Sequence, residues 1–531
     1  MKLPSLPIAI LAILLFVVHS SSDSLSLENF LQCFANHISQ SSTPLSTVIF
    51  TPSNSSFASL LLNRTSNRRY TTPTTPKPLA IVAAQNPSHV QVTVICAKSH
   101  DLQIRIRSGG HDYEGLSYVS QVPFIVLDMF NLHSVQVDKR KETALVQAGA
   151  TMGELYYNIA KESNVHAFPA GVCVTLGAGG HISGGGYGNL MRKYGLSIDN
   201  IIDAELVDVN GRILNRKTMG EDLFWAIRGG GAASFGVVLS WKIKLVSVPS
   251  QVTVFRVKKT LEEGVTDLVY KWQLVASDLD NDLFIRVMPL VINGTQEGKK
   301  TIRVSFIGQF LGNIDRLISL MNKSFPELGL KESDCIGMPW VNSTLFWADY
   351  PIGTSIDELL VNHKQPTQFF KSKSDYVKQP IPKTAIESIW KWMIDGENMW
   401  MQWNPYGGKM REISSSETPF PHRAGILFLI QYYTHWEKQG YEETNHYMNF
   451  SRSFHEFMAP YVSKYPREAF LNYRDFDIGV NPGNGTSIDI ADSSYGRKYF
   501  KDNLERLVHV KTVVDPDNFF KHEQSIPTNL L

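Results

Sequence analysis

Two glycine-rich stretches hold the residue types of this sequence that could do chemistry. The first, 104–118, reads "IRIRSGGHDYEGLSY" and begins like a strand that ends at residues 107–110. Successive backbone N–H groups in such a turn can form a concave anion site, suited to a pyrophosphate. His111 follows directly. A histidine in a tight turn is more often simply hydrogen-bonded there, so the motif needs support from elsewhere in the chain.

The second stretch, 168–195, reads "FPAGVCVTLGAGGHISGGGYGNLMRKYG" and places Cys173 just before a run of glycines. Glycine at this density lets the backbone approach a flat or phosphorylated ligand closely, because no Cβ intervenes. The run is not a dinucleotide fingerprint. Ile182 stands at the third glycine of G-x-G-x-x-G, and no apolar strand precedes the run. Nicotinamide binding is therefore not expected.

Strand-like and helix-like segments alternate from Leu79 onward and must position these stretches. Short β-branched segments bounded by turn signals predict strands, namely "LAIVAA", "LQIRIRS", "FIVLDM", "SVQVD", "TALVQAGA" and "FGVVLSWKIKLV", and "IIDAELVDVNGRIL" predicts two strands joined by an Asn-Gly turn. Helical patterns are "HVQVTVICAKSH", "MGELYYNIAK" and "EDLFWAIRGGG". Near Pro249 longer segments rich in Trp, Tyr and Phe begin and continue to about Tyr465. We expect a second domain there, and a return to the first from about Phe470.

Composition excludes some classes of function. The 531 residues are 43% hydrophobic, enough for a large core and two domains, and the formal net charge is only +1. No basic stripe or cluster of Lys and Arg interleaved with aromatic residues occurs in the sequence, so nucleic acid and anionic membrane surfaces are not expected partners.

The start of the sequence predicts secretion. Lys2 precedes the apolar run 8–18 and the polar "HSSSDS", as in a cleaved signal peptide. A membrane anchor is the alternative, but about eleven apolar residues fall short of the ~20 that span a bilayer. Seven N-x-S/T sequons favour a glycosylated, secreted chain, and they begin at Asn54, Asn63, Asn293, Asn322, Asn342, Asn449 and Asn484.

Four cysteines are too few for a disulfide scaffold of this size. Cys33 and Cys96 each lie on a helical pattern, and a bridge between these two helices is plausible. Cys173 and Cys335 remain. For either of them a buried inert thiol is the simplest interpretation.

The motifs "RSGGHDYEG", "GVCVTLGAGGHISGGGYG", "EDLFWAIRGGG", "LNYRDFDIG" and "VDPDNFFKHEQSIP" occur in order. They resemble the plant berberine-bridge-enzyme-like group of secreted FAD-linked oxidoreductases, within the vanillyl-alcohol-oxidase superfamily, from about Ser26 to the C-terminus. The resemblance implies an α+β fold with a two-subdomain FAD-binding domain, an inserted antiparallel-sheet substrate domain and a C-terminal berberine-bridge-type segment. We expect a signal peptide at 1–22, the first part of the FAD-binding domain at 23–249, the substrate domain at 250–465 and the completing segment at 466–531.

The same resemblance gives Cys173 a role. It implies FAD held by two covalent bonds, from His111 to the 8α-methyl carbon and from Cys173 to C6 of the isoalloxazine. His181 would lie against the ribityl chain, where a satisfied structural histidine is the alternative. The remaining cofactor contacts are expected from the two glycine stretches, at Arg107, Ser108, Gly109, Gly110, Gly177, Gly179, Gly180 and Ser183.

Substrate-side residues follow from the aligned motifs. Tyr113, Tyr187 and Tyr473 match tyrosines near the flavin, and Gln431 stands where alkaloid-cyclising members have a catalytic glutamate, which argues against berberine-bridge chemistry proper. Oxidising an alcohol or phenol by hydride transfer to flavin N5 also needs a proton acceptor, and a tyrosine is the available type. Members that oxidise lignin precursors have a lysine where Leu429 stands here. Tyr187 then loses its expected cation, and part of the expected role moves to Tyr473.

Electron disposal is predicted from Leu176. In the family, a valine at this position leaves a pocket beside flavin C4a where oxygen can react. Leucine fills that pocket, so we expect slow reoxidation of the reduced flavin by oxygen. Val174 stands where the family usually has proline and could loosen this turn.

Several alternatives stay open for the function. The substrate could be a sugar or oligosaccharide hydroxyl, another alcohol or a prenylated phenolic, and the electron acceptor is open. The flavin could instead be the scaffold of a non-redox cyclase, or a vestige in a carbohydrate-binding wall protein. We expect a monomer without a membrane anchor, destined for the apoplast, cell wall or vacuole.

Overall fold

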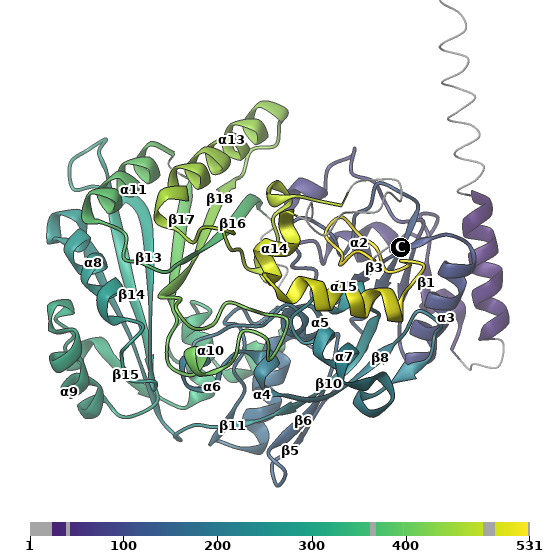
Figure 1. Cartoon of the computed structure of the whole chain (residues 1–531), viewed down its shortest axis with the longest axis horizontal. Helices are drawn as coiled ribbons and strands as arrows, with labels where there is room; N and C mark the ends of the chain where they lie inside the picture. The colour runs from purple at the N-terminus through teal and green to yellow at the C-terminus, as the bar shows by residue number, and fades with distance from the viewer. Residues whose placement is uncertain (1–23, 39–42, 362–367, 397, 482–493, 529–531) are drawn as a thin grey trace, which may run out of the picture.

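The structure, a computed structural model, describes residues 24–38, 43–361, 368–396, 398–481 and 494–528. The expected signal peptide and the sequon at Asn484 lie outside these ranges. Inside them, parallel and antiparallel sheets are surrounded by helices, which confirms the α+β fold expected from the sequence (Figure 1). No helix in the described ranges is long and apolar enough to cross a membrane.

A small sheet near the N-terminus carries the first glycine stretch. Its order is β1-β2-β4-β3, with bounds β1 (Ile49–Phe50), β2 (Ala80–Ala83), β4 (Phe124–Asp128) and β3 (Gln103–Arg107). The strands β2, β4 and β3 are parallel, and helix α3 (Pro87–Ser99) makes the crossover that parallel strands require. Strand β3 ends at Arg107, so the turn that bears His111 leaves from the carboxyl edge of this sheet.

A second, antiparallel sheet supports the second glycine stretch. Its order is β5-β6-β10-β8-β9, with bounds β5 (Val135–Asp138), β6 (Thr143–Gln147), β10 (Val237–Lys244), β8 (Ile201–Val207) and β9 (Ile213–Leu214). The expected Asn-Gly turn joins β8 to β9, and Gly211 there has a φ of +74°, a conformation that favours glycine. Helices α4 (Met152–Glu162), α5 (Ala178–Ser183) and α7 (Arg216–Ile227) pack around this sheet.

The third sheet, called here the large sheet, is antiparallel with the order β15-β12-β14-β13-β17-β18-β16. Its bounds are β15 (Cys335–Met338), β12 (Val252–Thr260), β14 (Lys300–Phe310), β13 (Leu283–Asn293), β17 (Met399–Pro405), β18 (Phe428–Trp436) and β16 (Phe369–Val377). Helices α8 (Val265–Val275), α11 (Lys383–Gly396) and α13 (Tyr441–Met458) cover one face. Because side chains alternate along a strand, Trp403 and Tyr432 pack under these helices while Gln402 and Gln431 face the rest of the molecule.

The C-terminal segment packs back on the N-terminal half. Helices α14 (Ser494–Phe500) and α15 (Asn503–Val514), yellow in Figure 1, lie between the large sheet and the other two sheets. Helix α15 contacts α7. Lys511 is fully buried there, and its Nζ donates to the carbonyls of Ser234 at 2.7 Å and Phe520 at 2.9 Å, which fixes α15 on the loop after α7.

A disulfide joins Cys33, on the helix at 24–37, to Cys96 on α3, as expected. Cys173 and Cys335 are free thiols. Burial raises the pKa of the Cys335 thiol to about 11, so it fits the inert interpretation.

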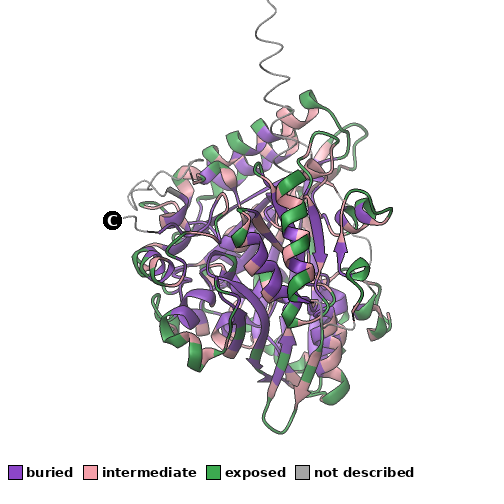
Figure 2. Cartoon of the chain, turned by 90° about the vertical axis from the view of Figure 1, so that its right-hand side faces the viewer, coloured by how far each residue is buried: buried purple, intermediate pink, exposed green. Residues whose placement is uncertain are grey.

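Burial follows the strands, and the exposed residues lie on outer helices and loops (Figure 2). Of the sequon asparagines in the described ranges, Asn54, Asn63, Asn293, Asn322 and Asn449 are exposed and Asn342 is half-buried. Their glycosylation stays a prediction.

Candidate active site

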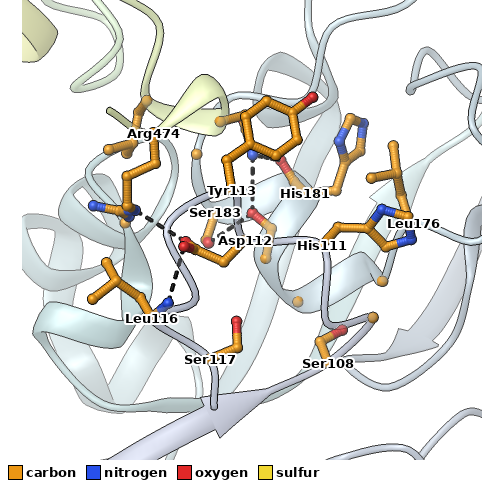
Figure 3. A pocket seen from close by; sticks show the side chains of 18 of the residues that line it. Ser108, His111, Asp112, Tyr113, Leu116, Ser117, Leu176, His181, Ser183 and Arg474 are labelled. Carbon is orange, nitrogen blue, oxygen red and sulfur yellow. Dashed lines mark hydrogen bonds and ion pairs between the residues drawn. The ribbon is translucent and has the colours of Figure 1, made fainter. Parts of the chain in front are cut away.

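A cavity of about 490 Å³ lies where the sheets and the C-terminal segment meet. Both glycine stretches line it, together with side chains of the large sheet and residues of the C-terminal segment (Figure 3). The cavity-lining residues of the large sheet are Arg286, Phe370, Trp400, Gln402, Gln431 and Tyr433, and those of the C-terminal segment are Phe470–Arg474, Phe520–His522 and Gln524.

The two glycine stretches touch each other through their backbones. A Cβ on Gly109 would lie 2.4 Å from the nitrogen of Gly177, and a Cβ on Gly177 would lie 2.0 Å from Oγ of Ser108. Gly180 differs, because nothing lies within 4 Å of the place where its Cβ would be, and it lines the cavity. The stretches thus form a close-packed floor with open space above it. This shape fits the flat and phosphorylated parts of a flavin dinucleotide.

His111 and Cys173 meet at one edge of this floor. Nε2 of His111 lies 3.0 Å from the hydroxyl oxygen of Thr175, and Sγ of Cys173 lies 3.5 Å from the same oxygen. Both side chains are partly exposed and line the cavity. Burial lowers the pKa of His111 to about 4, so its imidazole is neutral and keeps a free electron pair at neutral pH. Two nucleophiles of the types expected for flavin attachment therefore face one cavity.

Most of the other expected cofactor contacts also line the cavity, but their side chains serve the fold. Oγ of Ser108 donates to the carbonyl of Ala148 at 2.6 Å, and Oγ of Ser183 donates to the carbonyl of Gly180 at 3.2 Å. These serines offer their backbone to a ligand, as the sequence suggested. Gly109, Gly110, Gly177 and Gly179 line the cavity as well.

Arg107 differs from the expectation. Its side chain is fully buried and does not line the cavity. The guanidinium donates to the carbonyls of Leu60 and Leu61 and to Asp128, each at 2.8 Å. It therefore ties the end of β3 to the preceding chain, and the turn after it begins the cavity wall.

His181 lines the cavity and is nearly buried, with 8% exposure. Its Nε2 accepts the backbone N–H of Gly171 at 2.9 Å. Burial and the neighbouring His111 lower the pKa of His181 to about 4. The ring is thus a satisfied, neutral histidine that also faces the ligand space, so both interpretations of His181 hold in part.

An ion pair connects the His111 turn to the C-terminal segment. Nε of Arg474 donates to the carboxylate of Asp112 at 3.1 Å, and the same carboxylate accepts the N–H groups of Glu114 and Leu116 at 3.0 Å (Figure 3). This contact places Tyr113 and Tyr473, which are neighbours of these residues in sequence, on the same side of the cavity.

The three expected tyrosines meet as one group. The hydroxyls of Tyr187 and Tyr473 are hydrogen-bonded to each other, and the rings of Tyr113 and Tyr473 stack with centroids 5.7 Å apart. Gln431 donates from Nε2 to the hydroxyl of Tyr113 at 2.9 Å. The residues predicted for the substrate side therefore lie together, and their roles toward flavin and substrate stay predictions.

Three polar residues of the large sheet complete the cluster and were not anticipated from the sequence. Gln402 is the cross-strand partner of Gln431, and its Nε2 donates to the hydroxyls of Tyr473 at 2.8 Å and Tyr187 at 3.3 Å. Asn404 donates to the Tyr187 hydroxyl at 3.1 Å, and its Oδ1 accepts from Nε of Arg286 at 2.7 Å.

Arg286 corrects the expectation that Tyr187 has no cation. Leu429, which stands where other members have a lysine, is fully buried. Its cross-strand partner Asn404 accepts a hydrogen bond from Arg286 of β13, which places the guanidinium of Arg286 near Tyr187 instead. Arg286 is 4% exposed, and no carboxylate of the described ranges forms an ion pair with it. Its charge therefore acts on the phenols.

The surroundings distinguish the two phenols. Burial raises the pKa of Tyr187, while Arg286 and hydrogen bonds with Tyr473 and Asn404 act in the opposite direction. Burial and the neighbouring phenols raise the pKa of Tyr473 well above its usual value, with less opposition. These surroundings favour the ionised form of Tyr187 over that of Tyr473, whereas the sequence analysis moved part of the expected role to Tyr473.

A buried ion cluster lies behind β16. Its members, called here the β16 ion cluster, are Glu114, Lys371, Lys373, Asp475 and Asp477. Nζ of Lys373 lies 2.7 Å from Asp475 and 2.8 Å from Asp477, and Lys371 binds Glu114 and Asp475. The cluster joins three chain segments next to the cavity: the segment after His111, strand β16 and the segment after Tyr473.

Leu176 also lines the cavity, beside His111 in Figure 3. It is half-buried, and its Cδ1 would lie 2.9 Å from a Cβ on Gly171. The leucine therefore fills space next to His111.

Comparison with known proteins agrees with this fold and site. Residues 78–216 match the model of an FAD binding domain, and residues 469–527 match "Berberine and berberine like". With its glycine floor and paired nucleophiles, the chain is an FAD-dependent oxidoreductase. It belongs to the berberine bridge enzyme-like family, since it is 55% identical to berberine bridge enzyme-like 4 of Arabidopsis thaliana over 98% of both chains.

Solved structures give the same result. Berberine bridge enzyme-like 28 from Arabidopsis thaliana is 45% identical with a TM-score of 0.88, covering 94% of this chain and 99% of that one. Phl p 4, a grass pollen allergen with glucose dehydrogenase activity, is 42% identical with a TM-score of 0.88, over 94% and 100%. A single isoleucine-to-valine variant of Phl p 4 is a glucose oxidase.

Proposed function

We propose that the protein carries FAD attached at both His111 and Cys173 and oxidises an alcohol, sugar or phenolic. The observation that carries the proposal is that two sets of residues, the nucleophilic pair and the tyrosine cluster, line the same cavity. His111 and Cys173 converge on Thr175, and the cavity also receives the tyrosine cluster with its buried cation. When bound, the flavin supplies an acceptor for a hydride.

The attachment follows from the state of His111. Its neutral imidazole would replace a hydrogen of the 8α-methyl carbon, the proton leaving to water and the two electrons leaving through the flavin to the electron acceptor of the enzyme. Because Nε2 is engaged with Thr175, Nδ1 is the nitrogen left for the bond. Cys173 supplies the second bond through sulfur. Two bonds from neighbouring turns hold one ligand without enclosing it, so the face toward the large sheet stays open for substrate.

Tyr187 receives the proton of the substrate hydroxyl in this proposal. Loss of hydride leaves positive charge on the substrate carbon, so the hydroxyl proton must leave in the same process. Arg286 and Asn404 stabilise the Tyr187 phenolate, and the Tyr187–Tyr473 hydrogen bond provides a second acceptor position. Tyr113 and Gln431 orient the substrate by hydrogen bonds.

We further infer that Leu176 limits oxygen use, so that the protein acts as a dehydrogenase. The Phl p 4 pair supports this, because one methylene separates a glucose dehydrogenase from a glucose oxidase in the same fold. Leu176 lies beside His111 in the cavity, where a side chain one methylene longer than valine would fill the space that a diatomic molecule needs.

Mass spectrometry of acid-precipitated protein tests the attachment. The wild-type chain and the single variants His111→Ala and Cys173→Ala should keep FAD mass, and the double variant should lose it. Retention of covalent flavin by the double variant would contradict the assignment. A single variant that loses all its flavin would mean that one bond depends on the other.

An anaerobic screen tests the reaction. Alcohols, sugars and prenylated phenolics are mixed with the holoenzyme while the oxidised flavin band is followed. A substrate should bleach this band, and Tyr187→Phe should slow the bleaching by about 10²-fold, as for loss of a general base. A ligand that is converted without bleaching would favour the non-redox cyclase.

We also propose secretion as a glycosylated monomer to the apoplast, cell wall or vacuole. The sequons that are exposed in the structure support it. Expression in a plant cell, with digestion by a glycosidase and fractionation of wall, apoplastic fluid and vacuole, would test destination and modification together.

A further inference from the structure

We propose that Phe370, Tyr433 and Trp400 form a binding subsite for a second, neutral ring of the substrate, next to the ring that is oxidised. The inference rests on the proposed oxidation, since it names the shape of the substrate at that same site. These residues are called here the aromatic platform.

The aromatic platform is a stack on the cavity face of the large sheet. The Tyr433 ring lies 4.9 Å from Phe370 with an angle of 23° between their planes, and 4.5 Å from Trp400 with an angle of 19°. Trp400 and Tyr433 are cross-strand partners on β17 and β18, and Phe370 lies on the neighbouring strand β16. All three residues line the cavity.

The aromatic platform lies next to the tyrosine cluster, at a distance of about one ring. Moving along β17 and β18 from Trp400 and Tyr433, the next residues on the same face are Gln402 and Gln431, which are also partners. Two residues of a strand span about 7 Å. A ring whose hydroxyl lies against the tyrosine cluster therefore leaves the next ring of the same molecule over the aromatic platform.

The stack keeps apolar surface open. Tyr433 and Trp400 stay partly exposed, whereas the aromatic side chains on the opposite face, such as Trp403, are fully buried under the helices. A stack that only filled the end of the sheet would be covered in the same way. Because Tyr433 is stacked between the two other rings, its edge and not its face is open to the cavity, and such an edge suits the face of a ligand ring in edge-to-face contact.

Charge selects a neutral ligand. Of the residues of the large sheet that line the cavity, only Arg286 is charged, and it is hydrogen-bonded to Asn404 beside Tyr187. The side chains between it and the aromatic platform are the amides Gln402 and Gln431. The second ring is therefore a sugar unit of an oligosaccharide or an aromatic ring joined to the oxidised unit. Both present a flat neutral face.

The test compares one-ring and two-ring probes. Glucose, cellobiose and phenyl β-D-glucoside are titrated anaerobically, and the dissociation constant and limiting rate of flavin reduction are measured separately. In Trp400→Ala the dissociation constants of the two-ring probes should rise by up to about tenfold, the upper range for one aromatic contact. That of glucose and all limiting rates should stay unchanged.

Matched variants separate stacking from damage to the fold. Trp400→Phe keeps a flat ring and should restore most of the two-ring affinity, and Tyr441→Ala, on an exposed residue of α13, should change nothing. Cellobiose and phenyl β-D-glucoside distinguish a sugar unit from an aromatic ring by which one loses more affinity. Equal loss for glucose and the two-ring probes, or no loss for any, would overturn the aromatic platform.

Equilibrium binding separates this inference from the proposed reaction. Calorimetry with the same probes needs no turnover. If no probe reduces the flavin but the two-ring probes bind more tightly than glucose and lose this advantage in Trp400→Ala, the subsite stands and oxidation of these sugars fails. If wild-type protein binds the two-ring probes no more tightly than glucose, the subsite is wrong whether or not flavin is reduced.

Discussion

A single guanidinium, that of Arg286, favours the ionised form of one phenol of the site, Tyr187. Arg286 is buried without a carboxylate partner among the described residues, and it contacts Tyr187 directly and through Asn404. A buried positive charge favours the ionised form of a neighbouring phenol, because the phenolate then neutralises it. The reactivity of Tyr187 therefore depends on a residue about 100 positions away in sequence.

Arg286→Met should leave less of Tyr187 ionised at physiological pH. Loss of an opposite charge at this distance raises a pKa by about 1–3 units, so the limb of the flavin-reduction profile that rises with pH should move to higher pH by that amount. Stopped-flow reduction over pH measures it. Arg286→Lys should restore part of the shift, and Arg316→Met, which removes an exposed arginine outside the cavity, should leave the position of the limb unchanged. A profile of Arg286→Met that superimposes on wild type would contradict the role.

Leu176→Val should speed reoxidation of the reduced protein by oxygen, because the shorter side chain opens space beside the attachment residues. Mixing photoreduced protein with oxygenated buffer measures this rate. Flavin reduction by substrate should be unchanged, and Leu176→Ile, which keeps the volume, should stay slow. Equal reoxidation rates for leucine and valine would remove Leu176 from the control of oxygen.

At the scale of elements, the large sheet assembles the site by register. Pairing of Gln402 with Gln431 and of Asn404 with Leu429 puts alternate residues of β17 and β18 under the tyrosines. The β16 ion cluster then fixes β16 against the segments that follow His111 and Tyr473. A slip of one residue would turn Gln402 to the helical face and bring Trp403 into the cavity.

This register explains what could and could not be predicted from the sequence. The β-branched segments and glycine turns predicted the strands because each has a local signature, whereas His111, Cys173 and the tyrosines were predicted only from motifs that resemble the family. Arg286, Gln402 and Asn404 look like ordinary polar residues of strands, and only long-range pairing gives them a common place. The expected cofactor contact of Arg107 was wrong for a related reason, because no local pattern shows that this arginine is buried away from the cavity.

Another buried contact ties the large sheet to its neighbours through Glu468. Its carboxylate lies 2.7 Å from Nδ1 of His422 and also binds Lys378, which follows β16. Lys501, between α14 and α15, lies 3.5 Å away. Burial alone would raise the pKa of Glu468, but the hydrogen bonds with His422 and Lys378 and the charge of Lys501 lower it to about 2.

Glu468 should therefore stabilise the fold at neutral pH and lose this effect in acid. A carboxyl whose folded pKa is depressed contributes stability above its unfolded pKa and loses it as pH falls through the folded value. The window here runs from about pH 4.5 down to about pH 2. Denaturant unfolding of wild type and Glu468→Gln should show a difference at pH 6 that shrinks steadily through this window. Glu442→Gln, an exposed control on α13, should show no such difference.

At the scale of the whole molecule, the Cys33–Cys96 disulfide closes a loop of sequence separation 63 and holds the helix at 24–37 on α3. Cross-linking a loop restricts the unfolded chain and contributes about 2–4 kcal/mol. The double variant Cys33→Ala/Cys96→Ala should therefore have a lower thermal midpoint, measured by circular dichroism, with unchanged flavin content. Cys335→Ala serves as the matched control and should stay close to wild type. Loss of flavin in the double variant would show that the disulfide is also needed for the flavin site.

The C-terminal segment has a consequence for the order of events in the cell. Asn472 hydrogen-bonds the carbonyls of Gly180 and His181, and residues 470–474 and 520–524 line the cavity. A ribosome-bound chain that has made only the two glycine stretches therefore lacks one wall of the cavity. We expect stable FAD binding only after synthesis ends, once the C-terminal segment has docked, so flavin content would report that a chain was completed and not cut short.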